Sequence, residues 1–185
     1  MNQFVVLSGC SGGGKSSVLA ELARRGYTVV EEPGRRIVRQ EMEHNGSALP
    51  WMDMTAFLRR AMELSLADRQ AMQHHPGWIF FDRGWIDAAA ARQRILGEPI
   101  PALLAEQHRY HRRVFLTPPW PEIYVSDSER KHGFEEAVVE YNHLLETYPA
   151  LGYEGIVLPQ ASVSARAELI LSTLGLPQLQ NLPSV

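Results

Sequence analysis

The sequence predicts an α/β protein in which a parallel β-sheet is covered by helices on both faces. Short apolar runs of three or four residues alternate along the chain with longer segments of helical periodicity. The first run leads directly into a glycine-rich loop and then a helix. Charged residues follow three of the runs, and ligands of parallel α/β sheets bind at the carboxyl ends of strands.

The glycine-rich loop matches the pattern G-x-x-x-x-G-K-[S/T] of a phosphate-binding P-loop. Its three consecutive glycines allow the backbone N–H groups to point inward at the positive end of the next helix. We expect Lys15 to reach the β- and γ-phosphates of ATP and Ser16 to place its hydroxyl on Mg²⁺. Cys10 occupies a free position of the motif and is predicted to be a small filler. The predicted nucleotide-binding residues of the loop are Gly9, Cys10, Ser11, Gly12, Gly13, Gly14, Lys15, Ser16 and Ser17.

Five apolar runs bounded by turn residues are predicted to be the strands of the sheet. They lie at 4–7, 27–30, 78–81, 114–116 and 156–158. Apolar positions at helical spacing predict helices at 17–25, 34–44, 54–75, 85–96, 101–111, 137–148 and up to about 174. Ala23 and Met42 are placed on the inward faces of the first two helices. Asp53 is typical of a helix N-cap, and either Ser162 or Ser164 is expected to cap the last helix.

The composition favours a single enzyme-sized domain. The chain has 185 residues, of which 45% are hydrophobic and 21% charged, which supplies enough apolar material for a core. A formal net charge of −3 gives no indication of nucleic-acid or anionic-membrane binding. The first apolar run is too short for a signal peptide, and no stretch approaches 18 apolar residues. We expect a cytoplasmic domain over 1–175 and a C-terminal tail over 176–185.

Two of the predicted strands end in carboxylates that are candidates for catalysis. Asp82 follows an apolar strand, as the acid that helps to hold the metal does in P-loop proteins, directly or through water. The alternative is that Asp82 only caps the next helix. Glu32 ends the second strand beside the loop, where a carboxylate can accept a proton from an attacking hydroxyl. The alternative is that Glu31 and Glu32 only favour the start of a helix.

Three more charged residues are predicted to bind the substrate. Glu31 is a candidate beside Glu32, and Arg35 is placed to clamp an anionic substrate. Arg83 is equally suited to holding a phosphate and to pairing with Asp87, one helical turn further on.

The polar stretch at about 122–136 is predicted to be an irregular lid, because long loops in compact domains often cover active sites. Arg130 within it is the candidate for neutralising charge on the transferring phosphoryl group, and a solvated charge run is the alternative. After the last strand, Gln160 and Ser162 are placed to flank the nucleotide base.

Together these motifs resemble those of a compact AAA-type P-loop family that includes the ribosylnicotinamide kinase domain of the bacterial NAD regulator. The resemblance implies a kinase-like sheet of five strands in the order 2-3-1-4-5, flanked by helices in three layers, with a lid. Glu32-Pro33 and Asp82-Arg83 are also similar to acid motifs of deoxynucleoside and thymidylate kinases, in which the acids serve as base and metal ligand. The features that carry the resemblance are 9–16, 31–35, 81–84 with Asp87, 114–116, Asp127-x-x-Arg130, and Val157-x-Pro159 with Ser162-Val163 and Arg166.

The first function hypothesis is a small-molecule kinase that binds ATP·Mg²⁺ and an acceptor hydroxyl, with nucleoside-like or cofactor-precursor-like acceptors. The second is a nucleotide-dependent ATPase or GTPase switch acting on a protein or lipid partner, because close members of the family are described as ATPases and a eukaryotic relative is associated with GTP and phosphoinositides. A third is nucleotide or nucleic-acid maintenance through a partner. The chain has no N-K-x-D motif, so a Ras-like guanine site is not indicated. The acceptor, the preferred base and the oligomeric state do not follow from the sequence.

Overall fold

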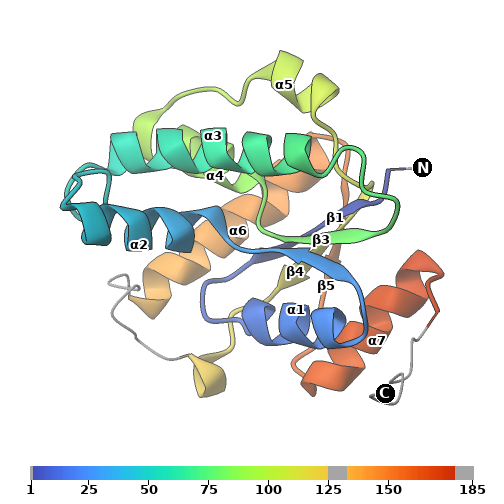
Figure 1. Cartoon of the computed structure of the whole chain (residues 1–185). Helices are drawn as coiled ribbons and strands as arrows, with labels where there is room; N and C mark the ends of the chain where they lie inside the picture. Colours follow the sequence, from blue (N-terminus) through green and yellow to red (C-terminus); the bar gives the residue numbers. More distant parts are fainter. Residues whose placement is uncertain (1, 125–132, 178–185) are drawn as a thin grey trace.

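Figure 1 shows the computed structural model, which describes residues 2–124 and 133–177. A five-stranded parallel sheet has the order β2-β3-β1-β4-β5. This is the order that the family resemblance implied. In the register of the sheet, Leu7 of the central strand pairs with Asp82 on one side and with Phe115 on the other. The strands are β1 (Phe4–Gly9), β2 (Thr28–Val30), β3 (Ile79–Asp82), β4 (Arg113–Thr117) and β5 (Glu154–Val157).

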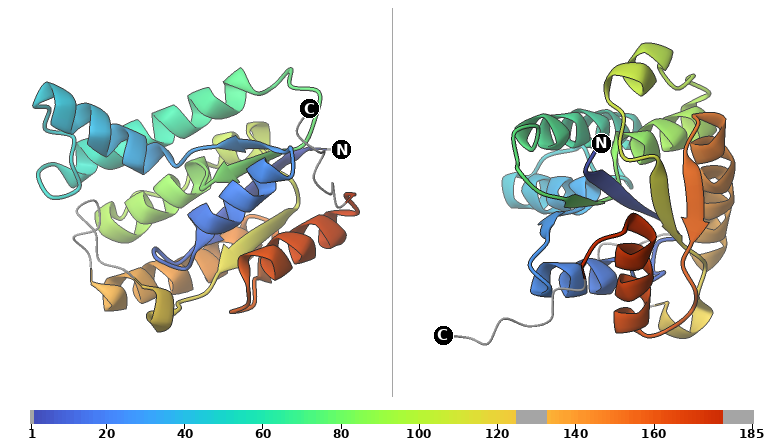
Figure 2. Two further views of the ribbon diagram at one scale, coloured as in Figure 1. Left: turned by 60° about the horizontal axis from the view of Figure 1, so that its bottom comes forward. Right: turned by 90° about the vertical axis from the view of Figure 1, so that its right-hand side faces the viewer.

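The helices form layers on both sides of the sheet (Figures 1 and 2). One layer consists of α1 and α7, which pack against each other. The other contains α4 and α6, with α3 against α4 and α2 against α3. The bounds are α1 (Lys15–Arg24), α2 (Pro33–His44), α3 (Met54–Ala71), α4 (Trp85–Leu96), α5 (Ala102–Gln107), α6 (Phe134–Ala150) and α7 (Val163–Leu174), with a short 3₁₀-helix, η1, at Pro121–Ile123.

Alternating side chains of the strands build two separate cores. Val5 and Leu7 of β1 point to one face and belong to the core that includes α1 and α7. Val6, between them, points to the opposite face and belongs to the core that includes α4 and α6. Because both faces of the central strands are covered, these strands are apolar on both sides, which explains their unbroken hydrophobic runs.

The predicted caps are largely those observed. The side chain of Asp53 accepts a hydrogen bond from the backbone N–H of Ala56 at 2.9 Å and begins α3. Ser162, rather than Ser164, caps α7 by accepting from the backbone N–H of Ala165 at 3.2 Å. These contacts satisfy N–H groups that have no partner within the helix.

Several predicted boundaries were wrong at helix ends. Helix α3 stops at Ala71 instead of His75, and α5 covers only Ala102–Gln107. The carbonyl of His108 accepts a hydrogen bond from Nε1 of Trp85 at 3.0 Å, so this residue is held outside the helix. Helix α6 begins three residues earlier than predicted, at Phe134, within the stretch that was expected to be irregular.

Two side chains that were expected to face inward are exposed. Ala23 lies beside the buried stripe of α1, which consists of Val18, Leu19 and Leu22. Met42 is 60% exposed because the buried residues of α2 are confined to its first half, ending at Val38. Figure 2 shows α2 extending away from the sheet, so its last turn has no core beneath it. No helix in the described part of the chain is long and apolar enough to cross a membrane.

Candidate active site

The loop between β1 and α1 is fixed in place by the end of β4. The backbone N–H of Cys10 donates to the carbonyl oxygen of Thr117 at 2.8 Å. Gly9 has φ 104°, and a Cβ atom there would lie 2.4 Å from the same carbonyl oxygen. A side chain at this position would therefore be excluded both by backbone conformation and by space, which gives a structural reason for the first glycine of the loop.

Lys15 is buried under the loop, and its Nζ donates to the carbonyl oxygen of Cys10 at 3.0 Å. Burial, together with the nearby Arg83 charge, lowers the pKa of this lysine. The ammonium group thus lies in a place where an additional negative charge would stabilise it. A phosphate group bound by the loop would supply that charge.

Asp82 is a buried carboxylate with unused hydrogen-bonding capacity. The residue is 6% exposed, and its Oδ1 has no hydrogen-bond partner among the described residues. Burial and the neighbouring Glu32 carboxylate raise the pKa of Asp82 to about 6. The alternative role as a helix cap is wrong, because the N-cap of α4 is Gly84.

The donor set around Lys15 suits Mg²⁺ bound mainly by phosphates and water. Ser16 lines the cavity above the loop, and Asp82 supplies a carboxylate that lacks a partner. The described residues contain no cluster of three histidine, cysteine or acidic side chains that would hold a metal by themselves. Mg²⁺ typically takes one or two protein oxygens and completes its shell with water and substrate phosphates.

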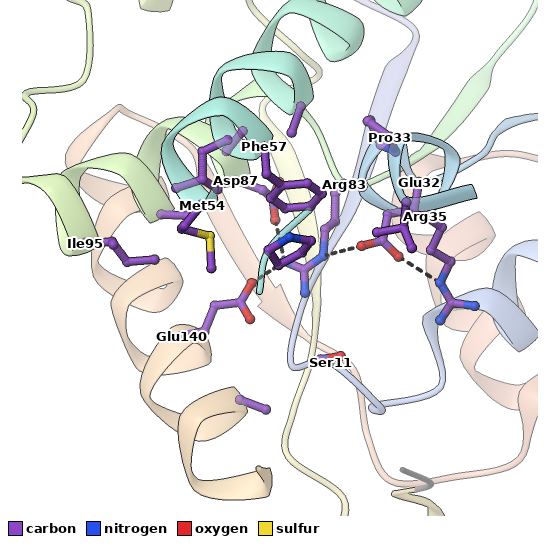
Figure 3. A pocket seen from close by; sticks show the side chains of 18 of the residues that line it. Ser11, Glu32, Pro33, Arg35, Met54, Phe57, Arg83, Asp87, Ile95 and Glu140 are labelled. Carbon is purple, nitrogen blue, oxygen red and sulfur yellow. Dashed lines mark hydrogen bonds and ion pairs between the residues drawn. The ribbon is translucent and has the colours of Figure 1, made fainter. Parts of the chain in front are cut away.

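Arg83 links three carboxylates from different elements (Figure 3). Its Nη1 lies 2.7 Å from Oε1 of Glu140 and 3.1 Å from Oδ1 of Asp87, and its Nε lies 3.5 Å from Oε1 of Glu32. Its Nη2 also donates to the carbonyl oxygen of Gly9 at 3.2 Å. The backbone of Arg83 has φ 66°, a left-handed conformation that is uncommon outside glycine. Of its two predicted roles, pairing with Asp87 is the one observed.

Asp87 joins this cluster to the core. Its Oδ2 accepts hydrogen bonds from the hydroxyl of Tyr148 at 2.7 Å and from the backbone N–H of Gly84 at 2.9 Å. Its Oδ1 accepts from the hydroxyl of Ser8. These contacts tie β1, α4 and α6 to one carboxylate, so the position of Arg83 is set by three elements at once.

The two adjacent glutamates after β2 point in different directions. Glu32 contacts Arg83 and accepts from Nε of Arg35 at 3.1 Å. Burial alone would raise the pKa of Glu32, but the charges of Arg83, Lys15 and Arg35 hold it below its ordinary value. The side chain of Glu31 is 52% exposed, pairs with Arg39 at 2.7 Å and lines neither of the cavities described below. The expectation that Glu31 binds substrate therefore receives no support.

Two cavities meet at this charged cluster. One, of about 450 Å³, lies over the loop and the start of α1. The other, of about 210 Å³, lies between α2, α3, α4 and α6 and is largely apolar. We call them the nucleotide cavity and the acceptor cavity. Four residues line both cavities: Ser11, Glu32, Arg35 and Arg83.

The far wall of the nucleotide cavity contains a residue that the predicted site omitted. Arg166 is 2% exposed, and its Nη1 donates to the carbonyl oxygen of Gly13 at 3.0 Å. Its guanidinium lies 5.2 Å from the ring centroid of Trp120. The sequence contained an indication of this residue, because Arg166 stands among apolar positions on the inner face of α7. The predicted nucleotide-binding residues that line this cavity, in addition to the shared Glu32, Arg35 and Arg83, are Ser11, Gly12, Gly14, Lys15, Ser16, Ser17 and Ser162.

Gln160, which was predicted to flank the nucleotide base, is not brought to either cavity. Gln160 is exposed and donates to the carbonyl oxygen of Pro119 at 2.8 Å, and it lines neither cavity. Arg130 lies outside the described residues. Of the predicted lid at 122–136, only the two ends are described, in and next to η1 and in the first turn of α6.

The acceptor cavity was not predicted as a pocket, although a pattern in α4 indicates it. Asp87, Ala88, Ala91, Arg94 and Ile95 lie on one stripe of the helix, and all line the cavity. The small alanine side chains leave the space, while Phe57 and Met54 of α3 close the opposite side (Figure 3). Alanine enrichment alone is also typical of a close-packed helix, so the sequence did not distinguish a pocket from a core.

Comparison with protein-family models gives a match to an AAA domain over residues 4–166. The chain belongs to this AAA-domain family. The matched range includes β1 to β5 and every described residue that lines the two cavities. Comparison with curated proteins gives no match.

Several kinases are among the solved structures with a similar fold. Deoxyadenosine kinase from M. mycoides with bound dATP is 16% identical with a TM-score of 0.62, covering 94% of this chain and 99% of that one. Shikimate kinase from Acinetobacter baumannii in complex with shikimate is 16% identical with a TM-score of 0.58, and the match covers 94% of this chain and 93% of the shikimate kinase chain. Thymidylate kinase from Ehrlichia chaffeensis is 16% identical with a TM-score of 0.54, and the match covers 95% of this chain and 99% of the thymidylate kinase chain. At this identity the likeness establishes the P-loop kinase-like fold.

Proposed function

We propose that this protein transfers the γ-phosphoryl group of ATP to a hydroxyl group of a small molecule. The observation that carries the proposal is the meeting of the two cavities at Glu32 and Arg83. A phosphate-binding loop alone fits an ATPase or a switch equally well. A second, largely apolar cavity that opens beside the phosphates provides a place for an acceptor, which a switch protein does not need. The similar folds of deoxyadenosine, shikimate and thymidylate kinases support this proposal.

In the proposed reaction, the oxygen of the acceptor hydroxyl forms a bond to the γ-phosphorus of ATP. The bond between that phosphorus and the β–γ bridging oxygen breaks, and ADP leaves with the electron pair. The hydroxyl proton passes to the carboxylate of Glu32, which lines both cavities. The charges of Arg83, Lys15 and Arg35 keep Glu32 ionised at neutral pH, so it is in the form that accepts a proton.

Lys15 and the loop N–H groups bind the phosphates and hold the transferring group in place. Arg35 also lines both cavities and is placed to contact the same phosphates or an anionic part of the acceptor. Ser16 and Asp82 would hold Mg²⁺, directly or through water. When bound, Mg²⁺ would neutralise part of the phosphate charge. Ser162 and Arg166 form the wall of the nucleotide cavity remote from the acceptor, where we place the nucleoside part of ATP.

A screen of hydroxyl compounds tests the proposal. The protein is incubated with ATP, Mg²⁺ and single nucleosides, cofactor precursors such as ribosylnicotinamide, hydroxy acids or sugars, and the products are analysed by mass spectrometry. We expect one chemical class to give ADP and a phosphorylated compound in equal amounts. ATP hydrolysis that is stimulated only by a protein or a lipid vesicle, without any phosphorylated small molecule, would favour the switch hypothesis.

A further inference from the structure

We infer that the acceptor carries an anionic group, a carboxylate or a phosphate, and that Arg94 binds this group at the end of the acceptor cavity remote from the loop. This inference rests on the proposed function and specifies its substrate class. The anion-binding part can be tested without any transfer reaction.

The position of Arg94 follows from the geometry of α4. Asp87, in the first turn of the helix, belongs to the charged cluster around Arg83, and Arg94 comes seven residues later on the same side. Seven residues of α-helix advance about 10 Å along the axis. Since both residues line the acceptor cavity, the cavity extends along this face of α4, away from the loop.

Arg94 is a cation without a counterion in the described part of the chain. Its Nε is buried and has no hydrogen-bond partner there. The neighbouring arginine of the same helix, Arg92, is paired instead: its Nε lies 2.8 Å from Oε2 of Glu98. A buried guanidinium N–H group that lacks a partner carries an energetic cost, which a bound ligand can remove.

The acidic residues that line the cavity do not neutralise Arg94. Asp87, Glu32 and Glu140 all contact Arg83. The remaining one, Glu136, forms neither an ion pair nor a hydrogen bond with Arg94 within the described residues. The carboxylates are thus gathered mainly at the loop end, and the unpaired cation lies toward the other end.

The space between the two ends is apolar. Met54, Phe57 and Leu58 of α3 face Ala91 and Ile95 of α4 across it. A ligand that fits this arrangement has a hydroxyl at Glu32, an apolar or flat body between the two helices, and an anionic end at Arg94. A guanidinium recognises carboxylates and phosphates through paired, charge-assisted hydrogen bonds, whereas a neutral oxygen gains much less.

The test measures binding of three matched probes, benzoate, phenyl phosphate and benzyl alcohol, by ligand-observed NMR with ADP and Mg²⁺ present to occupy the loop. We expect one of the anions to bind the protein at least about 10-fold more tightly than benzyl alcohol. Preference for benzoate or for phenyl phosphate shows whether the natural group is a carboxylate or a phosphate.

Matched variants locate the binding site. Arg94→Gln should remove the preference for the anion, whereas Arg92→Gln, which removes the same charge from the same helix, should leave it within about 2-fold. Arg94→Lys keeps the charge without the paired donors and should retain part of the preference. This variant also serves if Arg94→Gln does not fold.

Three results would overturn the inference: equal binding of the alcohol and both anions, equal effects of the Arg92 and Arg94 variants, or no binding of any probe at millimolar concentration. Its failure is distinguishable from failure of the proposed function. If neutral hydroxyl compounds are phosphorylated without anion preference, the kinase proposal stands and Arg94 has no such role. If the preference depends on Arg94 but no compound is phosphorylated, the anion site stands and the kinase proposal fails.

Discussion

The Nε atom of Arg83 lies 3.5 Å from Oε1 of Glu32, at the junction of the nucleotide and acceptor cavities. The same guanidinium also holds Glu140 of α6 and Asp87 of α4. The carboxylate proposed as the base therefore takes its position from an arginine that is itself fixed by two further helices.

Arg83→Gln should destabilise the protein by about 3 kcal/mol, because removing one partner of a buried ion cluster leaves its carboxylates uncompensated. The free energy of unfolding in urea measures this effect. The control is Arg112→Gln, which removes an ion pair between the exposed side chains of Arg112 and Glu154 and should change the free energy of unfolding far less. Equal effects of the two variants would mean that the Arg83 cluster contributes no more than a surface pair.

Lys15→Ala should lose most of the thermal stabilisation by ATP·Mg²⁺, since its ammonium is the charge beneath the phosphate loop. Turnover should fall by at least about tenfold. Because burial lowers the pKa of Lys15, its charged form is disfavoured in the nucleotide-free protein, and a bound phosphate should relieve this cost. Undiminished ATP stabilisation in the folded variant would contradict the assignment of the loop.

The raised pKa of Asp82 predicts that the free energy of unfolding depends on pH in the absence of nucleotide and metal. Its pKa is about 6 in the folded protein against an ordinary value of 3.8, so the folded state binds more protons between these values. The contribution of Asp82 to stability therefore falls as pH rises from about 4 to 6, by at most ~3 kcal/mol. The Asp82→Asn variant has no carboxyl group to ionise at this position, so it should not show this fall in stability as pH rises.

The measurement for Asp82 is urea unfolding of wild type and Asp82→Asn at several pH values from 4 to 7. The stability of the variant relative to the wild type should increase over this range and then level off. A difference that stays constant with pH would show that the burial of Asp82 does not shift its titration. With ATP and Mg²⁺ added, the variant should lose its advantage if Asp82 helps to hold the metal.

Ala91→Phe should fill the acceptor cavity between α3 and α4 and slow phosphoryl transfer by about tenfold or more, with little change in ATP affinity. Gln93→Phe, on the exposed side of the same helix, adds the same side chain outside the cavity. Transfer by the two variants with an identified acceptor is compared at saturating ATP. Similar rates would show that the acceptor binds elsewhere.

Local patterns in the sequence were sufficient for the α/β class and for the five strands, whereas the strand order followed from the family resemblance. The apolar runs of β1 and β3 are buried on both faces, so they stand out without any knowledge of their neighbours. The loop at Gly9–Ser16 has its own motif, and its position between strand and helix follows from the chain order. Helix ends were less predictable, because contacts from distant residues decide them, as Trp85 does for His108.

Candidate site residues could be identified from the sequence only where one element supplies the residue. Asp82 and Lys15 follow directly from their strand and loop. The choice between Glu31 and Glu32 depends on how the chain turns after β2 and on where Arg83 lies, and neither is visible in two adjacent glutamates. The partnership of Arg83 with Glu140 joins residues 57 positions apart, which a single sequence does not indicate.

The central claim is that Glu32 accepts the proton of an acceptor hydroxyl at the junction of the two cavities. The most direct measurement compares phosphoryl transfer and ATP affinity in Glu32→Gln and Glu31→Gln, using an acceptor found in the screen. Transfer by Glu32→Gln should fall by about 10²-fold with ATP affinity little changed, because the variant keeps the shape of the side chain but loses its basic site. Glu31→Gln, whose side chain pairs with Arg39 outside both cavities, should transfer within about threefold of the wild type. If Glu32→Gln also stays within threefold, Glu32 is not the base and the proposed mechanism is wrong.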